Sequence, residues 1–151
     1  MKRTVPILAT LALLAGCGSS GGDGAPAACL APTADYLEAL RSAPAQVRLS
    51  GTTAISDCFT GTEAPGIGQT VIKAATKLNA EALRNPGGPQ AVSLGYLAGA
   101  VHEGAESAAG ADADLVRRLD AAARFSPGGG TLGAAFERAY GKGYAAGQEG
   151  G

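Results

Sequence analysis

Apolar residues recur at three- and four-residue steps through most of the chain after residue 66, which is the spacing of one face of an α-helix. The clearest case runs from Ile67 to Ala82, where Lys73 and Lys77 occupy other positions. The Asn-Pro-Gly-Gly run at 85–88 then ends the pattern, because proline and consecutive glycines do not continue a helix. The spacing therefore predicts one well-bounded helix that begins near Ile67.

Four further segments show helical spacing. One begins near Thr33, which can cap it, and ends before Pro44. The other three begin at Pro89, which suits a first turn, and at Asp112 and Thr131, which can act as caps. The sequence has no series of alternating strand patterns. The pattern thus predicts an all-α fold, a small antiparallel bundle of four to five helices.

The first seventeen residues have the pattern of an export signal. Lys2 and Arg3 precede an apolar run, Val5–Leu14, that is too short to span a bilayer. The run leads into Leu-Ala-Gly-Cys at 14–17, which resembles the lipobox of bacterial lipoproteins. The resemblance implies cleavage before Cys17 and a diacylglyceryl group, with fatty acids such as palmitate, on its sulfur. In the alternative, an ordinary secretory signal, Cys17 is incidental.

These features divide the chain into four parts. Residues 1–16 form the signal peptide, and residues 17–28 combine the lipidated cysteine with a flexible Gly/Ser-rich tether. The helical domain covers residues 29–147, and the glycine-rich tail at 148–151 is expected to fray. The lipid would hold the domain on the extracytoplasmic side of the cell membrane, because two acyl chains anchor a protein stably.

Cys29 and Cys58 are the thiols that remain beside Cys17. In an exported protein an even pair predicts a disulfide. Such a bond would also order residues 46–59, which could form either a short extended piece or a loop. A metal or redox pair is the alternative, but the spacing is not Cys-x-x-Cys and the one histidine, His102, is far along the chain. The sequence therefore predicts one disulfide.

Charge and composition narrow the classes of partner. The twelve Lys and Arg residues include Lys2 and Arg3 of the signal, so ten basic residues face thirteen acidic ones in the mature chain. The basic residues are scattered, which argues against nucleic acid and anionic lipid head groups as partners.

The chain has 24 glycines, many alanines and no tryptophan, so each buried side chain contributes little apolar area.

His102 and Glu106 lie four residues apart in a predicted helix, so their side chains can share one face. With a third ligand such as Asp112 or Asp114 they could hold a metal ion. The alternative is a solvated helix end, which the single histidine favours. The preferred interpretation is thus a helix end without a metal, and no cofactor is expected.

Two stretches match catalytic or nucleotide-binding motifs only in part. Ser93 lies in Ala-Val-Ser-Leu-Gly at 91–95, which lacks the first glycine and the strand of a nucleophile elbow, and His102 would lie on the same helix. The Gly-Gln-Thr at 68–70 lacks the lysine of a phosphate-binding loop. These departures argue against a hydrolase and against a nucleotide site.

Small and aromatic residues also recur at four-residue spacing. Gly95 and Gly99 make a smooth stripe that lets two helices approach closely, and packing within the domain is favoured over contact between two copies. Tyr140 and Tyr144 follow Phe136 at the same spacing. The two tyrosines are expected in the core, with an aromatic binding surface as the alternative.

The body of the chain also resembles a family. Ser-Asp-Cys at 56–58 and the segments Ala74–Asn79 and Leu94–Val101 are similar to small uncharacterised exported proteins of high-GC actinobacteria, over residues 50–147. The resemblance implies a helical domain and assigns no activity. The leading functional hypothesis is therefore a non-enzymatic binding or structural lipoprotein that presents a helical surface to an envelope protein. A carrier of a small ligand or metal ion is the second hypothesis, and an envelope-acting hydrolase is the third.

Overall fold

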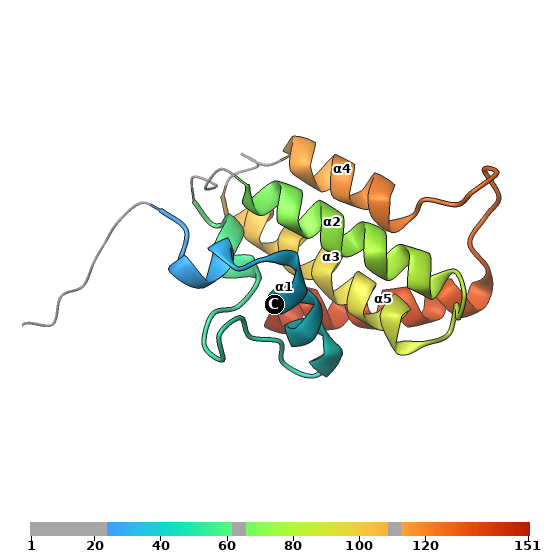
Figure 1. Cartoon of the computed structure of the whole chain (residues 1–151), viewed down its shortest axis with the longest axis horizontal. Coiled ribbons are helices and arrows are strands. Elements are labelled where there is room, and N and C mark those ends of the chain that lie inside the picture. Colours follow the sequence, from blue (N-terminus) through green and yellow to red (C-terminus); the bar gives the residue numbers. More distant parts are fainter. Residues whose placement is uncertain (1–23, 62–65, 109–112) are drawn as a thin grey trace, which may run out of the picture.

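Five α-helices and three short 3-10 helices form the part of the chain that the computed structural model describes, residues 24–61, 66–108 and 113–151. The α-helices are α1 (Thr33–Ala39), α2 (Ile67–Ala82), α3 (Pro89–Ser107), α4 (Ala113–Ala123) and α5 (Ala134–Gly150), and the 3-10 helices are η1 (Ala27–Leu30), η2 (Leu40–Ser42) and η3 (Ser56–Phe59). These described residues contain no β-strand, and an isolated bridge joins Leu49 and Thr53. The predicted all-α class and helix number are confirmed (Figure 1).

Helix α3 is the centre of the bundle. It contacts α2, α4, α5, η2 and η3, and Leu94, Tyr96 and Leu97 are all fully buried although they point in different directions around the helix. A helix that is buried on nearly every side needs no single apolar face. In Figure 1, α2 and α4 cover one side of α3 and α5 lies against another.

Glycines make the contact between α3 and α5 a close one. Gly95 and Gly99 of α3 lie against the α5 backbone, and Gly143 and Gly147 of α5 lie against the α3 backbone. Residue numbers increase together along this contact, so the two helices run in the same direction, whereas α2 and α3 run antiparallel (Figure 1). The predicted packing of Gly95 and Gly99 inside the domain is therefore confirmed.

The disulfide joins η1 to η3. The sulfurs of Cys29 and Cys58 are 2.02 Å apart, the Cα atoms are 5.5 Å apart, and both residues are buried. The Tyr36 hydroxyl on α1 donates a hydrogen bond of 2.9 Å to the Cys29 carbonyl. The disulfide thus fastens η1 to η3, which itself packs on α3.

Residues 46–55 form an ordered loop rather than a strand, and η3 follows at 56–59. Val47, Leu49 and Ile55 are buried in the core, and the chain reverses between them at Ser50 and Gly51, which have positive φ angles of 50° and 78°. Of the two predicted alternatives for this segment, the structure shows the loop.

Three expectations about segment ends are wrong. Thr33 and Thr131 do not cap helices: Pro32 precedes α1 and Gly133 precedes α5, and neither helix start has a side-chain cap. Asp112, the third predicted cap, lies outside the described residues, whereas Pro89 occupies the first turn of α3 as predicted. Residues 148–151 do not fray, because α5 continues to Gly150.

The C-terminal turn of α5 is held by one side chain from the loop at 46–55 and one from η3. Arg48 Nη1 donates a hydrogen bond of 3.0 Å to the Gly150 carbonyl, and the Ser56 hydroxyl donates one to the Gly151 oxygen. The last carbonyls of a helix lack partners within the helix, so these donors explain why the turn stays ordered. None of the helices in the described ranges has the length and apolarity that a bilayer crossing needs.

Candidate functional site

A groove lies where α3, α4 and α5 meet, and it consists of two adjoining cavities. The first has a volume of about 300 Å³ and is lined by His102, Asp120, Arg124, Glu137, Tyr140, Gly141 and Tyr144. The second has a volume of about 380 Å³ and shares His102 and Asp120 with the first. Its other walls are Ala105, Glu106, Ala113, Val116 and Arg117. Both volumes are at the lower end of the range for small-molecule sites.

His102 and Asp120 form the pair that both cavities share. His102 Nε2 lies 3.1 Å and 3.2 Å from the two carboxylate oxygens of Asp120. The His102 side chain is 21% exposed and that of Asp120 is 40% exposed, so a ligand can reach the carboxylate without unfolding the protein. The Tyr144 ring meets the His102 ring edge to face with centroids 5.4 Å apart. The imidazole is therefore fixed between α4 and α5.

Three stacked aromatic rings on α5 lead from the core into the groove. Phe136 and Tyr140 lie with centroids 5.7 Å apart, and Tyr140 and Tyr144 with centroids 6.1 Å apart. Phe136 and Tyr140 are buried and Tyr144 is half-buried. The core prediction is thus confirmed for Tyr140, whereas Tyr144 lies at the edge of the core and in the groove.

The groove changes the acidity of both tyrosines. Burial, followed by the negative charge of Asp120, raises the pKa of Tyr140 to about 12, although Arg124 opposes the shift. Burial also raises the pKa of Tyr144, and Asp120 and Glu106 add to the effect. Both hydroxyls therefore remain protonated at neutral pH and can donate hydrogen bonds to a ligand.

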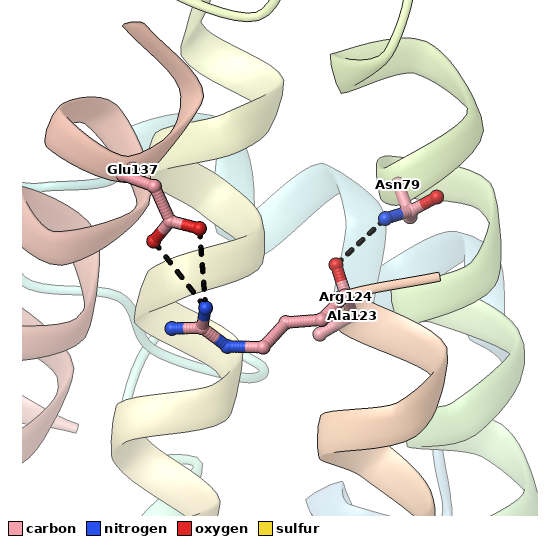
Figure 2. A network of polar contacts seen from close by, with 4 residues as sticks. All are labelled: Asn79, Ala123, Arg124 and Glu137. Carbon is pink, nitrogen blue, oxygen red and sulfur yellow. Dashed lines mark hydrogen bonds and ion pairs between the residues drawn. The ribbon is translucent and has the colours of Figure 1, made fainter. Parts of the chain in front are cut away.

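Arg124, just after α4, reaches across to α5. Its guanidinium carbon lies 4.8 Å from the centroid of the Tyr140 ring. Nη1 donates hydrogen bonds of 3.2 Å and 3.3 Å to the two carboxylate oxygens of Glu137 (Figure 2). The Arg124 and Glu137 side chains are 50% and 44% exposed. The side chain thus combines an ion pair with a cation–π contact at the surface of the groove.

The end of α4 is anchored separately on α2. The Asn79 side-chain amide donates a hydrogen bond of 2.6 Å to the carbonyl of Ala123 (Figure 2). Asn79 is buried, so this bond satisfies two polar groups that water does not reach. Consequently the backbone next to Arg124 is fixed, while its side chain projects toward α5.

A third cavity lies away from the groove, between α2 and the end of α4. It has a volume of about 430 Å³ and is mostly apolar, with Leu83, Ala122 and Phe125 among its lining residues. Phe125 is 61% exposed. It supplies a second aromatic surface with which the groove can be compared by experiment.

The predicted metal candidates lie at the groove, but they do not form a metal centre there. His102 and Glu106 line the second cavity, while Asp114 pairs with Arg117 and Arg118. In residues 24–61, 66–108 and 113–151, no group of three His, Cys, Asp or Glu side chains could hold a metal ion. Asp112 lies outside these ranges.

Ser93 and His102 are not brought together. Ser93 lies inside α3 and is buried, and its hydroxyl donates a hydrogen bond of 2.8 Å to the Leu40 carbonyl. His102 lies nine positions further along the same helix, about 13.5 Å along the axis, so the pair lacks the geometry of a nucleophile and its base. In the described part of the chain, nothing positively indicates an enzyme.

Asp120, Arg124 and Glu137 belong to the groove but were missed from the sequence. One weak pattern could have indicated two of them. Val116, Asp120 and Arg124 recur at four-residue steps, directly beside the buried series Leu115, Leu119 and Ala123. Residues along such a boundary stripe meet neighbouring helices at the edge of the core, which is where grooves form.

The chain was compared with protein-family models, curated proteins and solved structures, and nothing matches in any of the three comparisons. The groove and the residues that line it are therefore the basis for a functional proposal.

Proposed function

We propose that the protein is a lipid-anchored, extracytoplasmic binding protein without catalytic activity, and that the groove between α3, α4 and α5 is its ligand site. The observation that carries this proposal is the partly exposed His102–Asp120 pair, which is shared by two adjoining cavities and lies against Tyr144.

The composition of the groove suits binding of a small molecule. Aromatic and alanine side chains supply apolar walls, and a few polar groups converge from different helices, as is typical of ligand sites. Asp120 accepts hydrogen bonds, and the protonated hydroxyls of Tyr140 and Tyr144 donate them. These groups can orient a bound molecule without a chemical step.

The anchor is supported by the sequence of the N-terminal segment. Leu-Ala-Gly-Cys at 14–17 resembles a lipobox, and Cys17 would carry the lipid. The disulfide of the folded part fits an oxidising, extracytoplasmic compartment, where such bonds persist. A lipid at Cys17 would keep the groove close to the membrane surface, where it could collect a ligand from the cell envelope.

Binding can be tested on the full chain, purified in nonionic detergent and labelled for NMR. We expect some members of a set of cationic, anionic and neutral small molecules to shift the amide signal of Gly141, which lines the first cavity. Tyr144→Ala should abolish these shifts, whereas Phe125→Ala, which removes an exposed aromatic ring outside the groove, should leave them unchanged. Shifts confined to the Phe125 cavity, or equal binding by the Tyr144 variant, would contradict the proposal.

The anchor has its own test. The intact mass of the membrane-fraction protein, measured without reduction, should correspond to a chain that begins at Cys17 with an added diacylglyceryl group. Cys17→Ser should move the protein out of the membrane fraction. An unmodified mass for the membrane-fraction protein would refute lipidation.

A further inference from the structure

We infer that the groove binds a small organic cation with a guanidinium or alkylammonium head group, in the place that the side chain of Arg124 occupies in this structure. The inference rests on the proposed function, because it names the ligand class of the same site. The Arg124 side chain would then fill the cation site until a ligand binds and displaces it.

The place that Arg124 occupies has the two components of a receptor for organic cations. One is the face of Tyr140, 4.8 Å from the guanidinium carbon, which attracts a cation through the negative side of its ring. The other is the carboxylate of Glu137, which accepts two hydrogen bonds from Nη1 (Figure 2). Planar guanidinium groups match both components at once.

The charges around this place also favour a cation. When the Arg124 side chain moves away, the first cavity keeps the carboxylates of Asp120 and Glu137, and His102 is its one other titratable group besides the tyrosines. His102 already pairs with Asp120 through Nε2. The cavity without Arg124 would therefore carry excess negative charge, and a cation would restore the balance.

Arg124 can leave without disturbing the bundle. Its side chain and that of Glu137 are about half exposed, and exposed ion pairs are weak. The backbone beside it stays fixed by the bond from Asn79 to Ala123. Displacement thus needs rotation of one side chain rather than movement of a helix, and the first cavity of about 300 Å³ has room for a small molecule.

The test compares two arginine variants of the full chain. Arg124→Ala empties the place on Tyr140, whereas Arg118→Ala removes the same charge from α4 at a residue that contacts Asp114. The probes are N-ethylguanidinium, its neutral analogue N-ethylurea and the anion propionate, and the dissociation constants come from NMR titration of Gly141. We expect Arg124→Ala to bind N-ethylguanidinium about three- to tenfold more tightly than wild type.

Two further comparisons make the result specific. Arg118→Ala should bind N-ethylguanidinium like wild type, and N-ethylurea should gain nothing in any variant. Adding Glu137→Gln to Arg124→Ala should remove the gain, because it removes the carboxylate charge. Arg124→Gln replaces the alanine variant if circular dichroism shows that the latter is unfolded.

The inference is overturned if the Arg124 and Arg118 variants bind N-ethylguanidinium equally. It is also overturned if wild type binds propionate and Arg124→Ala does not, because Arg124 would then be an anion receptor. In that second case the groove is still a ligand site, and the proposed function stands. If no cationic, neutral or anionic compound shifts the groove signals of wild type or variants, both the inference and the proposed function fail.

Discussion

Replacing Gly99 by alanine tests whether the contact between α3 and α5 is as close as the structure shows. A Cβ at this position would lie 3.0 Å from the carbonyl carbon of Tyr144 and closer still to its oxygen. The opposing atoms belong to the α5 backbone, so rotation of a side chain cannot relieve the overlap. The two helices would have to separate.

The expected change in unfolding free energy for Gly99→Ala is the sum of two opposing contributions. Carbon atoms in favourable contact lie about 3.5–4.0 Å apart, so α5 must move by more than about 0.5 Å, and a gap of about that size already weakens the surrounding dispersion contacts. Overpacking of this kind costs about 1–3 kcal/mol, and the rigid backbone neighbour places Gly99 at the upper end. Alanine regains about 1 kcal/mol because it favours the helix more than glycine does. The expected net loss of unfolding free energy is about 2 kcal/mol.

Urea unfolding followed by circular dichroism, with the disulfide intact, measures this loss. With a urea slope of about 2 kcal/mol per molar, the midpoint of Gly99→Ala should fall by about 1 M. Gly141→Ala is the matched control, because Gly141 also lies in a helix but a Cβ there would meet nothing within 4 Å. That control should raise the unfolding free energy by about 0.5–1 kcal/mol. The reasoning is refuted if Gly99→Ala is as stable as wild type, or if both variants shift in the same direction.

Three other predictions concern stability. Replacing Cys29 and Cys58 together by serine should lower the unfolding free energy, measured in urea titrations, by about 3.6 kcal/mol. The reason is that the disulfide closes a loop across a sequence separation of 29 residues. A loss below about 1 kcal/mol would contradict this chain-entropy argument. The pKa of Tyr140 rises from 10.0 to about 12 on folding, so the stability that this residue contributes is fully present below pH 10 and is lost as the pH rises to about 12. Tyr140→Phe should flatten this decline of the unfolding free energy with pH, and an unchanged slope would contradict the prediction. A double-mutant cycle of His102→Ala and Asp120→Ala should give a coupling of about 1 kcal/mol or less, because the pair is partly exposed; a coupling near 3 kcal/mol would mean that water does not reach it.

Local signals in the sequence are sufficient to predict where the central helices α2 and α3 begin. Ile67 and Pro89 begin α2 and α3 as predicted, because a turn or a proline ends one pattern and the next one starts at once. The sequence pattern predicts the start of α5 too early, at Thr131 rather than Ala134. Its N-cap is Gly133, which has no side chain to form a recognisable cap, and a glycine-rich loop precedes it.

The groove could be predicted only in part. His102, Tyr140 and Tyr144 stood out by residue type and spacing, and the structure places all three in the first cavity. Asp120 and Glu137 are ordinary surface carboxylates in the sequence, 18 and 35 positions after His102. Their meeting depends on how α4 and α5 lie along α3, and a hydrophobic pattern within one helix contains no information on that arrangement.

The C-terminal residues 148–151 differ from the sequence prediction because of their packing. A glycine-rich end has low helix propensity, and local propensity alone therefore predicts fraying. Propensity is outweighed here by tertiary contacts, because Gly147 packs against the α3 backbone and Arg48 binds the Gly150 carbonyl. The same glycines that weaken an isolated helix allow this one to approach its neighbour.

The disulfide has a consequence for how the protein responds to proteases. Pro44, Ala45 and Gln46, and again Ser50 to Thr52, are exposed residues between the two bonded cysteines, and exposed loops are where proteases cut first. A single cut at either place would leave both pieces covalently joined through Cys29 and Cys58. With the lipid at Cys17 that we propose, a nicked domain would therefore stay attached to the membrane and keep its groove there, whereas reduction followed by the same cut would release it.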